Sequence, residues 1–311
     1  MGKVLLSVGD IEADDWLRGL SLEHDVVMNV DQQSAQEIKY AVVWKPEHGT
    51  LAKLPNLEVI FSVGAGVDHI LSDPQLPDVP IVKVVSENLT QHVTEYVVWR
   101  VLDHHRQGAL YREQQRAGLW SEKPQRPAQE VSVGIMGLGQ LGRSAGLALK
   151  HLGFRINGWS RTSQQVDGIT SYHGDADLTP FLNDTDILVI LLPLTPETEG
   201  IINYELLSRL RRLPAYPGPV LINAGRGKLQ REPDILKALT DGTIQQATLD
   251  VFEEEPLPAR SPLWGLPNLV VTPHAAGMSD PNHLVPAMLR QMAAYERSGD
   301  LGPVIDRTLG Y

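Results

Sequence analysis

The residues best suited to chemistry follow two apolar segments in the last third of the chain. Arg226, flanked by glycines, lies three residues after Val220–Asn223, and His274 lies two residues after Leu269–Thr272. A guanidinium can hold a carboxylate or polarise a carbonyl oxygen, and a histidine, which titrates near pH ~6.5, can transfer a proton. We therefore expect Arg226 and His274 to belong to one site. A surface arginine and a structural histidine are the alternatives.

Three consecutive acids, Glu253, Glu254 and Glu255, lie between these two positions. A carboxylate beside His274 would favour its protonated form. A run of acids is more often a solvated loop, and spacing does not say which of the three would face the histidine.

A glycine fingerprint gives the strongest signal for a bound cofactor. The apolar run Val131–Met136 ends in Gly137-Leu138-Gly139-Gln140-Leu141-Gly142, and a helical pattern follows. In such a strand–turn–helix unit, Gly137 permits the tight turn, Gly139 lets the backbone approach a pyrophosphate, and Gly142 lets the helix pack on the strand. The N–H groups at the start of the helix then face the phosphates.

The end of the next predicted strand, Arg155–Trp159, bears on cofactor choice. An acid here would accept hydrogen bonds from the ribose 2′-hydroxyl of NAD, but this chain has Ser160-Arg161-Thr162. Arg161 can meet an adenosine 2′-phosphate with two charge-assisted hydrogen bonds. The segment therefore predicts a preference for NADP(H) over NAD(H), and a solvated loop arginine is the alternative.

A second glycine turn lies early in the chain, after the predicted strand Val59–Val63. It reads Val63-Gly64-Ala65-Gly66, followed by Val67-Asp68. Successive backbone N–H groups in such a turn form a nest for a small anion such as a substrate carboxylate. The alternative is a plain turn before a helix that Asp68 caps.

Composition limits the classes of function. The chain has 311 residues, 42% of them hydrophobic, no cysteine and a formal net charge of −11. It has no apolar run near the ~20 residues of a membrane span, and its acidity argues against a nucleic-acid partner. Without cysteine there is no disulfide framework, thiolate nucleophile or cysteine metal site, and we expect no metal. Acidic residues soon after the first apolar segment argue against a signal peptide, so we expect a cytoplasmic protein without membrane association.

Strands alternate with helices, which predicts an α/β protein with parallel sheets. Helices are expected over about 92–115 and 281–297, and a loop over 118–127. The predicted strands are Val4–Val8, Ala41–Trp44, Val59–Val63, Ile81–Val85, Val131–Met136, Arg155–Trp159, Ile187–Leu192, Val220–Asn223, Ala247–Val251 and Leu269–Thr272.

We predict two Rossmann-like domains. Residues 1–97 with 279–311 form a flavodoxin-like substrate domain, and the dinucleotide-binding domain, 98–278, is inserted into it. Ligands bind outside the carboxyl ends of parallel strands, so the active site is expected in the cleft between the domains.

Six sequence motifs, given in chain order at the end of this paragraph, resemble those of the D-2-hydroxyacid dehydrogenase family. They span nearly the whole chain. Within the family the chain is most similar to a bacterial branch of glyoxylate/hydroxypyruvate reductases, by Trp44, Trp159–Thr162, Glu255–Pro258 with Ser261–Trp264, and Gly310-Tyr311. The motifs are Gly64–Asp68, Gly137–Gly142, Leu192–Thr198, Asn223–Gly227, Leu249–Phe252 running to Glu255–Pro258, and Thr272–His274.

The resemblance implies roles that spacing leaves open. It assigns Arg226 to the substrate carboxylate and carbonyl, Glu255 to orienting the histidine, and His274 to proton transfer. Trp44 would wall the substrate pocket, with plain core as the alternative. The substrate carboxylate would sit on the backbone of Val63, Gly64, Ala65 and Gly66; the cofactor would contact Gly137, Gly139, Gln140, Leu141, Gly142, Ser160, Arg161, Thr162, Pro193, Thr198, Ala224 and Asp250.

Two positions depart from the family pattern. Gly225 stands where alanine is more common, which would loosen the backbone before Arg226. Gln230-Arg231-Glu232 replaces a more apolar and acidic segment, which we interpret as surface variation.

The function these observations predict is NADPH-dependent reduction of small 2-keto acids, glyoxylate and hydroxypyruvate, to D-2-hydroxy acids. The D configuration and a homodimer are implied by the resemblance. The alternatives are a reductase of a larger keto acid such as phenylpyruvate, and a non-catalytic dinucleotide-sensing protein. Phosphoglycerate dehydrogenase is disfavoured because Arg161 argues against NAD and no regulatory domain follows.

Overall fold

The computed structural model describes residues 2–9, 11–84, 86–213 and 218–311. Contacts divide the chain into two compact units, Met1–Leu89 with Met278–Tyr311 (unit 1) and Thr90–Gly277 (unit 2). Unit 2 is therefore inserted into unit 1. The boundary expected after residue 97 falls inside helix α3 (Glu87–His105), whereas the contacts divide the chain after Leu89.

Unit 1 is built on a parallel five-stranded sheet in the order β2-β1-β3-β4-β5. This is the flavodoxin-like order. Its strands are β1 (Lys3–Ser7), β2 (Val26–Val27), β3 (Ile38–Val43), β4 (Val59–Ser62) and β5 (Ile81–Lys83). Its other elements are α1 (Asp14–Leu20), η1 (Ser34–Gln36), η2 (Leu51–Lys53), α2 (Asp68–Leu71) and α9 (Pro281–Ser298).

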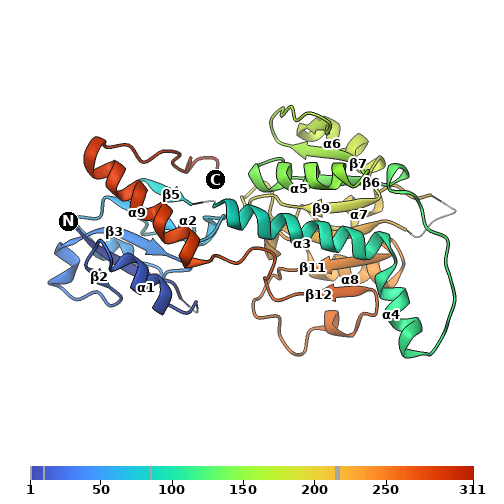
Figure 1. The fold of residues 1–311 in the computed structure, drawn as a ribbon, viewed down its shortest axis with the longest axis horizontal. Helices are drawn as coiled ribbons and strands as arrows, with labels where there is room; N and C mark the ends of the chain where they lie inside the picture. The colour runs from blue at the N-terminus through green and yellow to red at the C-terminus, as the bar shows by residue number, and fades with distance from the viewer. Residues whose placement is uncertain (1, 10, 85, 214–217) are drawn as a thin grey trace. The chain divides into compact units, whose positions relative to one another are not determined.

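Both faces of this sheet are covered, because its strands are apolar on both sides. Trp16 of α1 and Met288 of α9 pack with Tyr40 and Phe61 on one face. Leu51 of η2 and Ile70 of α2 belong to the cluster on the other face. Figure 1 shows α1 and α9 lying together over the sheet.

Unit 2 has a seven-stranded parallel sheet in the order β12-β11-β10-β9-β6-β7-β8. Its strands are β6 (Ser132–Met136), β7 (Arg155–Ser160), β8 (Thr170–His173), β9 (Ile187–Ile190), β10 (Val220–Asn223), β11 (Gln246–Leu249) and β12 (Leu269–Val271). Its remaining helices are α4 (Gly108–Arg116), η3 (Ala128–Glu130), α5 (Gln140–His151), α6 (Gly174–Asn183), α7 (Tyr204–Ser208), η4 (Gly227–Leu229), α8 (Glu232–Thr240) and η5 (Pro262–Gly265).

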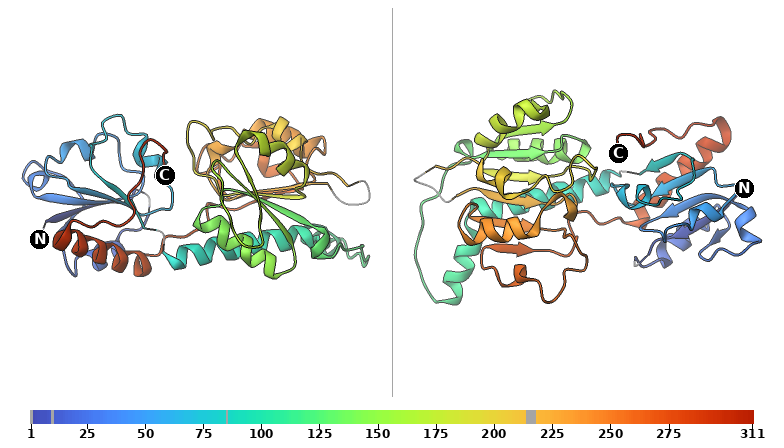
Figure 2. Two further views of the ribbon diagram at one scale, coloured as in Figure 1. Left: turned by 90° about the horizontal axis from the view of Figure 1, so that it is seen from above. Right: turned by 180° about the vertical axis from the view of Figure 1, so that it is seen from behind.

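The strand order reverses between β6 and β9, which is the Rossmann arrangement, and dinucleotides bind at such a switch point. Helices α6, α7 and α8 cover one face of the sheet, and α3 and α5 cover the other (Figure 2). The register also aligns the carboxyl ends of six strands in one row. The row is Trp159, Met136, Ile190, Asn223, Leu249 and Val271.

The predicted α/β class with two parallel sheets is confirmed, and three details differ. The helix expected over 92–115 is two helices, because Gln107 adopts a left-handed conformation (φ 58°) between α3 and α4. Strands β2 and β8 were not predicted, since one is very short and the other is largely polar. Val85, the expected last residue of one strand, lies outside the described residues.

Over the described ranges, no helix has the length and apolar character needed to cross a membrane. The same residues contain no group of three or more acidic or histidine side chains arranged to hold a metal ion.

Candidate active site

The glycine turn after β6 is shaped by close backbone contacts at two of its three glycines. Gly137 has φ +107°, and a Cβ atom there would lie 2.6 Å from the Leu191 carbonyl oxygen. A Cβ on Gly142 would overlap the Gly137 carbonyl oxygen. Gly139 caps α5 without a side-chain hydrogen bond, and nothing lies within 4 Å of a Cβ placed on it. Two glycines are thus fixed by backbone contacts, while the third leaves the helix N-terminus open to an anion.

The first turn of α5 carries Gln140 and Leu141. Gln140 is exposed and donates through Nε2 to the Thr90 hydroxyl at 3.1 Å, and Leu141 is half-buried. Both therefore lie next to the open glycine, as expected for residues whose backbone would face a pyrophosphate.

The segment after β7 carries Arg161 on an exposed turn. The Ser160 hydroxyl donates to the Thr162 carbonyl at 2.8 Å and closes this turn. A second guanidinium, which sequence reasoning missed, approaches from α5, because Arg143 donates to Gln164, whose amide lies 3.5 Å from the Thr162 hydroxyl. The turn therefore offers hydroxyls and positive charge where a 2′-phosphate would bind.

Glu197, in the loop after β9, lies within electrostatic range of this turn. A hydrogen bond with Thr195 is the main cause that lowers the pKa of the Glu197 carboxyl, and the charge of Arg161 adds to it. An acid near Arg161 is thus present, but it is supplied by a different strand end from the one where an NAD site would carry it.

Thr198 acts within the loop that follows β9. Its hydroxyl donates to the Pro193 carbonyl at 2.7 Å and accepts from the Thr195 N–H at 2.8 Å. Pro193, which the resemblance places beside the nicotinamide riboside, is therefore held in position by Thr198.

The loop after β10 presents Arg226. Asn223 holds the loop, because its side chain accepts from the Gly225 N–H at 3.0 Å and donates to the Arg226 carbonyl at 3.1 Å. The half-buried guanidinium donates to the Gly225 carbonyl at 2.9 Å. Ala224 is tied to β9 through the Ile190 carbonyl at 3.2 Å.

Gly227 explains why this loop lies against the segment after β11. A Cβ atom on Gly227 would overlap the backbone of Phe252, so only glycine allows this approach. Gly225 is also crowded, since a Cβ there would lie 2.9 Å from Leu229 Cδ1 and 3.1 Å from the Leu192 oxygen. A side chain at position 225 would therefore crowd its neighbours, which glycine avoids.

The interpretation of Gln230 as surface variation is wrong. Gln230 is 2% exposed, donates to the Val251 carbonyl at 3.0 Å and accepts from Asn223 Nδ2 at 2.8 Å. It joins the loop that carries Arg226 to the segment after β11. No signal in one sequence separates such a buried amide from an exposed one.

His274 and Glu255 lie together. His274 Nδ1 is 3.0 Å from Glu255 Oε2, and Glu255 Oε1 accepts from the Phe252 N–H at 3.1 Å. About a third of the His274 side chain and a quarter of Glu255 are exposed. A carboxylate on Nδ1 fixes the orientation of the imidazole ring.

The other two acids of this segment are arranged differently. Glu253 accepts from the Glu232 N–H at 2.7 Å, and Glu232 accepts from the Glu253 N–H at 2.8 Å. This reciprocal pair closes the start of α8, and burial raises the pKa of the Glu232 carboxyl. Glu254 is exposed. Of the three acids, Glu255 is therefore the one that contacts His274.

Asp250 is 1% exposed, and both its carboxylate oxygens accept hydrogen bonds from the turn that carries His274. These hydrogen bonds hold the turn that carries His274 in place. The residues after the six aligned strand ends, among them Ser160, Gly137, Ala224 and Asp250, share one edge of the sheet of unit 2.

In unit 1, the turn Val63–Gly66 has its carbonyl groups occupied. The Ser279 hydroxyl donates to Val63 at 2.9 Å, and the Ser62 hydroxyl lies 3.1 Å from the Gly64 oxygen and 3.3 Å from that of Gly66. Among the described residues, no backbone acceptor takes a hydrogen bond from the N–H of Gly64, Ala65 or Gly66. The turn thus presents N–H groups, as an anion nest does.

Trp44 packs over this turn. A Cβ atom on Gly64 would overlap the indole ring, so Gly64 is required by the ring above it. The His69 ring lies 4.5 Å from the Trp44 ring, centroid to centroid, and Lys45 Nζ lies 5.6 Å from it. Trp44 is half-buried.

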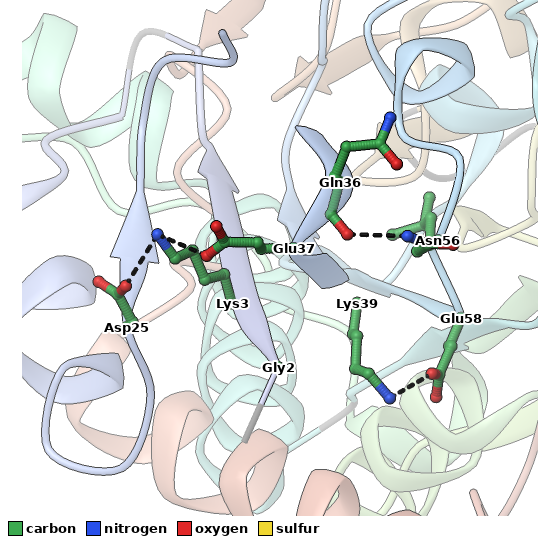
Figure 3. Close-up of a pocket in the computed structure, with 9 residues that line it drawn as sticks. Gly2, Lys3, Asp25, Gln36, Glu37, Lys39, Asn56 and Glu58 are labelled. Carbon is green, nitrogen blue, oxygen red and sulfur yellow. Dashed lines mark hydrogen bonds and ion pairs between the residues drawn. The ribbon is translucent and has the colours of Figure 1, made fainter. Parts of the chain in front are cut away.

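A hollow of about 600 Å³ lies elsewhere in unit 1, at the amino ends of its strands, and contains none of the predicted site residues. Figure 3 shows Lys3 between Asp25 and Glu37, and Lys39 against Glu58. These ammonium and carboxylate groups already pair with one another.

The fold and these strand-end residues agree with a comparison against known families. Residues 98–276 match the family described as D-isomer specific 2-hydroxyacid dehydrogenase, NAD binding domain. The chain is also 36% identical, over 96% of its length, to glyoxylate/hydroxypyruvate reductase A of Yersinia enterocolitica, of which it covers 97%. The chain belongs to the D-isomer specific 2-hydroxyacid dehydrogenase family.

Two solved structures are similar to this chain over its whole length. The NADPH-dependent glyoxylate/hydroxypyruvate reductase of Sinorhizobium meliloti, in complex with NADP and sulfate, is 40% identical with a TM-score of 0.94, and both chains are fully covered. A probable 2-hydroxyacid dehydrogenase of Rhizobium etli, in complex with NADP, HEPES and L(+)-tartaric acid, is 42% identical with a TM-score of 0.93 and the same coverage.

Proposed function

We propose that this protein is an NADPH-dependent reductase that converts small 2-keto acids, glyoxylate and hydroxypyruvate, to D-2-hydroxy acids. The observation that carries the proposal is the His274–Glu255 pair, 3.0 Å apart, at the strand-end row that also carries Arg226. The names of the relatives support the substrate class.

The residues divide the chemistry among them. When bound, NADPH would supply the hydride that reduces the keto carbon. Arg226 would stabilise the negative charge that develops on the carbonyl oxygen, and His274 would donate a proton to it. Glu255 keeps the imidazole aligned. The product is a 2-hydroxy acid, and the histidine regains its proton from solvent.

The cofactor preference rests on two features of unit 2. The open helix N-terminus at Gly139 fits a pyrophosphate, and Arg161 with Arg143 supplies positive charge for a 2′-phosphate. Relatives solved with NADP or NADPH support this assignment. We assign Pro193, Ala224 and Asp250 to the nicotinamide riboside end, with Thr198 shaping the loop.

The substrate carboxylate is assigned to Arg226 and to the N–H groups of Gly64, Ala65 and Gly66, with Val63 preceding them. Trp44 then limits the length of the acid. On this assignment unit 1 is the substrate domain and unit 2 the dinucleotide domain, with the boundary at Leu89 in place of residue 97.

We also propose a cytoplasmic homodimer. The NADPH-dependent reaction needs the intracellular cofactor pool. An arm formed by α4 and residues 117–127 extends beyond the sheet of unit 2 (Figure 1), and it carries Trp120, 100% exposed, and Leu119, 57% exposed. Such apolar side chains indicate a surface that a second copy covers. Light scattering of wild type and Trp120→Ser tests this assembly.

Steady-state oxidation of NADPH tests the function. Glyoxylate, hydroxypyruvate, phenylpyruvate and acetaldehyde are compared with NADPH and with NADH, and His274→Ala serves as the inactive control. We expect turnover with the two small keto acids and NADPH. A preference for phenylpyruvate would assign a larger substrate. Cofactor binding without turnover of any acid would indicate a dinucleotide sensor.

A further inference from the structure

The turn that carries His274 is held in a backbone conformation that its own sequence does not favour. His274 has φ 52°, in the left-handed region. A non-glycine residue stays there only when its surroundings hold it. The groups that hold this turn therefore determine where the imidazole lies.

A chain of hydrogen bonds from helix α3 ends at this turn. The Thr272 hydroxyl donates to Asp250 Oδ1 at 2.6 Å, so the Tyr96 hydroxyl, 2.6 Å from Thr272 Oγ1, is the donor to Thr272. Asp250 then accepts from the N–H groups of Ala275 at 2.8 Å and Ala276 at 2.9 Å. The His274 N–H donates to the Asp250 carbonyl at 2.8 Å.

This chain is shielded from water at its carboxylate and phenol ends. Tyr96 is 5% exposed and Asp250 is 1% exposed. Burial, and next the charge of Asp250, raise the pKa of Tyr96, so its hydroxyl keeps the proton that it donates. A buried carboxylate that loses one donor cannot readily replace it with water.

We propose that Tyr96 and Thr272 are positioning residues for His274, acting through Asp250 and the backbone of residues 274–276. The proposal rests on the proposed function, because it assigns these hydroxyls to the geometry of that proton transfer. Their spacing, 176 residues apart, gives no local pattern to find.

The test compares Tyr96→Phe with Tyr40→Phe. Tyr40 is 1% exposed in unit 1 and also donates to a carboxylate, Glu296, at 3.3 Å. Both variants lose one buried hydroxyl. We expect Tyr96→Phe to lower kcat about 10- to 100-fold, the scale of a misplaced catalytic group, with little change in the KM for NADPH. Tyr40→Phe should lower the melting temperature and leave kcat unchanged.

Two variants of Thr272 test the second hydroxyl of the same hydrogen-bond chain. Thr272→Ser keeps the hydroxyl and should retain wild-type kcat, whereas Thr272→Val keeps the shape but removes the donor to Asp250, so it should lower kcat at least as much as Tyr96→Phe. The double variant Tyr96→Phe/Thr272→Val should be no worse than Thr272→Val alone, because the Tyr96 hydroxyl acts through that of Thr272. Additive losses would mean that the hydroxyls act separately and would overturn the proposal.

NMR of the His274 ring separates this inference from the proposed function. We expect its imidazole signals and their pH titration to change in Tyr96→Phe and to stay the same in Tyr40→Phe. If the wild-type protein reduces no keto acid, the proposed function is wrong. The NMR signals of His274 in the variants then decide by themselves whether Tyr96 and Thr272 position its ring. If wild type is active and Tyr96→Phe matches it in kcat and in these signals, the inference is wrong.

Discussion

The two units each place a glycine turn after a parallel strand, and the glycines are required for different reasons. In unit 2, Gly137 and Gly142 are fixed by backbone atoms of neighbouring turns, and Gly139 leaves a helix N-terminus open. In unit 1, Gly64 is fixed by the indole ring of Trp44, a side chain distant in sequence. The glycine spacing in the sequence indicates the backbone constraints of unit 2. It does not indicate that the indole of Trp44 packs against Gly64.

The difference extends to what each unit supplies. Unit 2 presents charged side chains held by dense hydrogen bonds, as His274, Glu255 and Asp250 show. Unit 1 presents backbone N–H groups beside a bulky ring. We infer that unit 2 determines the rate of the chemistry and the choice of cofactor, whereas unit 1 determines which acid is accepted.

The largest effect is expected where the proton is transferred. His274→Ala should lower kcat for glyoxylate reduction by about 10²–10⁴, with the KM for NADPH nearly unchanged. Glu255→Gln removes the carboxylate that holds the ring through Nδ1, so kcat should fall with the KM for NADPH nearly unchanged. Glu253→Gln, in the pair that closes α8, is the matched control. Wild-type kcat in Glu255→Gln would remove Glu255 from the site.

Arg226→Lys tests whether charge alone is enough in unit 2. Lysine keeps the charge but lacks the planar, two-pronged donor. We expect kcat/KM for glyoxylate to fall about 10- to 100-fold, the scale of a lost hydrogen bond to a charged group. Arg231→Lys, on the exposed surface nearby, should match wild type. Full activity in Arg226→Lys would show that Arg226 acts only as a distant positive charge.

The contrast between the units also explains how much of the fold and site sequence reasoning could reach. The strand ends that carry Arg226 and His274 were predictable, because apolar runs mark the strands and parallel strands end at one edge. The glycine fingerprint was predictable because its three glycines follow a strand at a fixed local spacing, although Leu191, which crowds Gly137, is distant in sequence. The His274–Glu255 pairing followed only from the family resemblance.

Other parts of the site depend on tertiary contacts that no local pattern records. Gln230 looked like surface because its polarity is typical of surface, yet it bridges Asn223 and Val251. Arg143 reaches the turn of Arg161 through Gln164, from another element. The division of helix 92–115 came from one left-handed residue, Gln107, which helix periodicity does not reveal.

Cofactor choice should respond to Arg161. Arg161→Ala should raise the KM for NADPH about tenfold or more, the scale of a lost charge-assisted contact, and leave the KM for NADH nearly unchanged. Glu197→Gln is the companion variant, because it removes the carboxylate whose pKa Arg161 helps to lower; it should tighten NADPH without affecting NADH. Equal losses for both cofactors in Arg161→Ala would contradict the assignment.

Unit 2 should also be the more sensitive unit to mild acid. His104 is buried between Gln246 and Thr248, and burial lowers its pKa below the ordinary value of 6.5 despite Asp103 nearby. The unfolded chain then binds the proton more readily, so stability is present above pH 6.5 and declines as the pH falls below it. Melting curves should show this decline in wild type and less of it in His104→Gln. An identical pH dependence in both would exclude His104 as its cause.

The smallest effect is expected in unit 1, where we propose that Trp44 limits the length of the acid. Trp44→Ala should raise kcat/KM for phenylpyruvate relative to glyoxylate by about tenfold or less, because removal of a wall changes sterics and not chemistry. Gly64→Ala should act in the same direction, since its Cβ displaces the indole. Gly265→Ala, with nothing within 4 Å of the added Cβ, is the matched control. If Trp44→Ala leaves this ratio unchanged while Gly64→Ala weakens both acids equally, the indole is core and the nest alone selects the substrate. The division between the units would then rest on carboxylate binding and not on size.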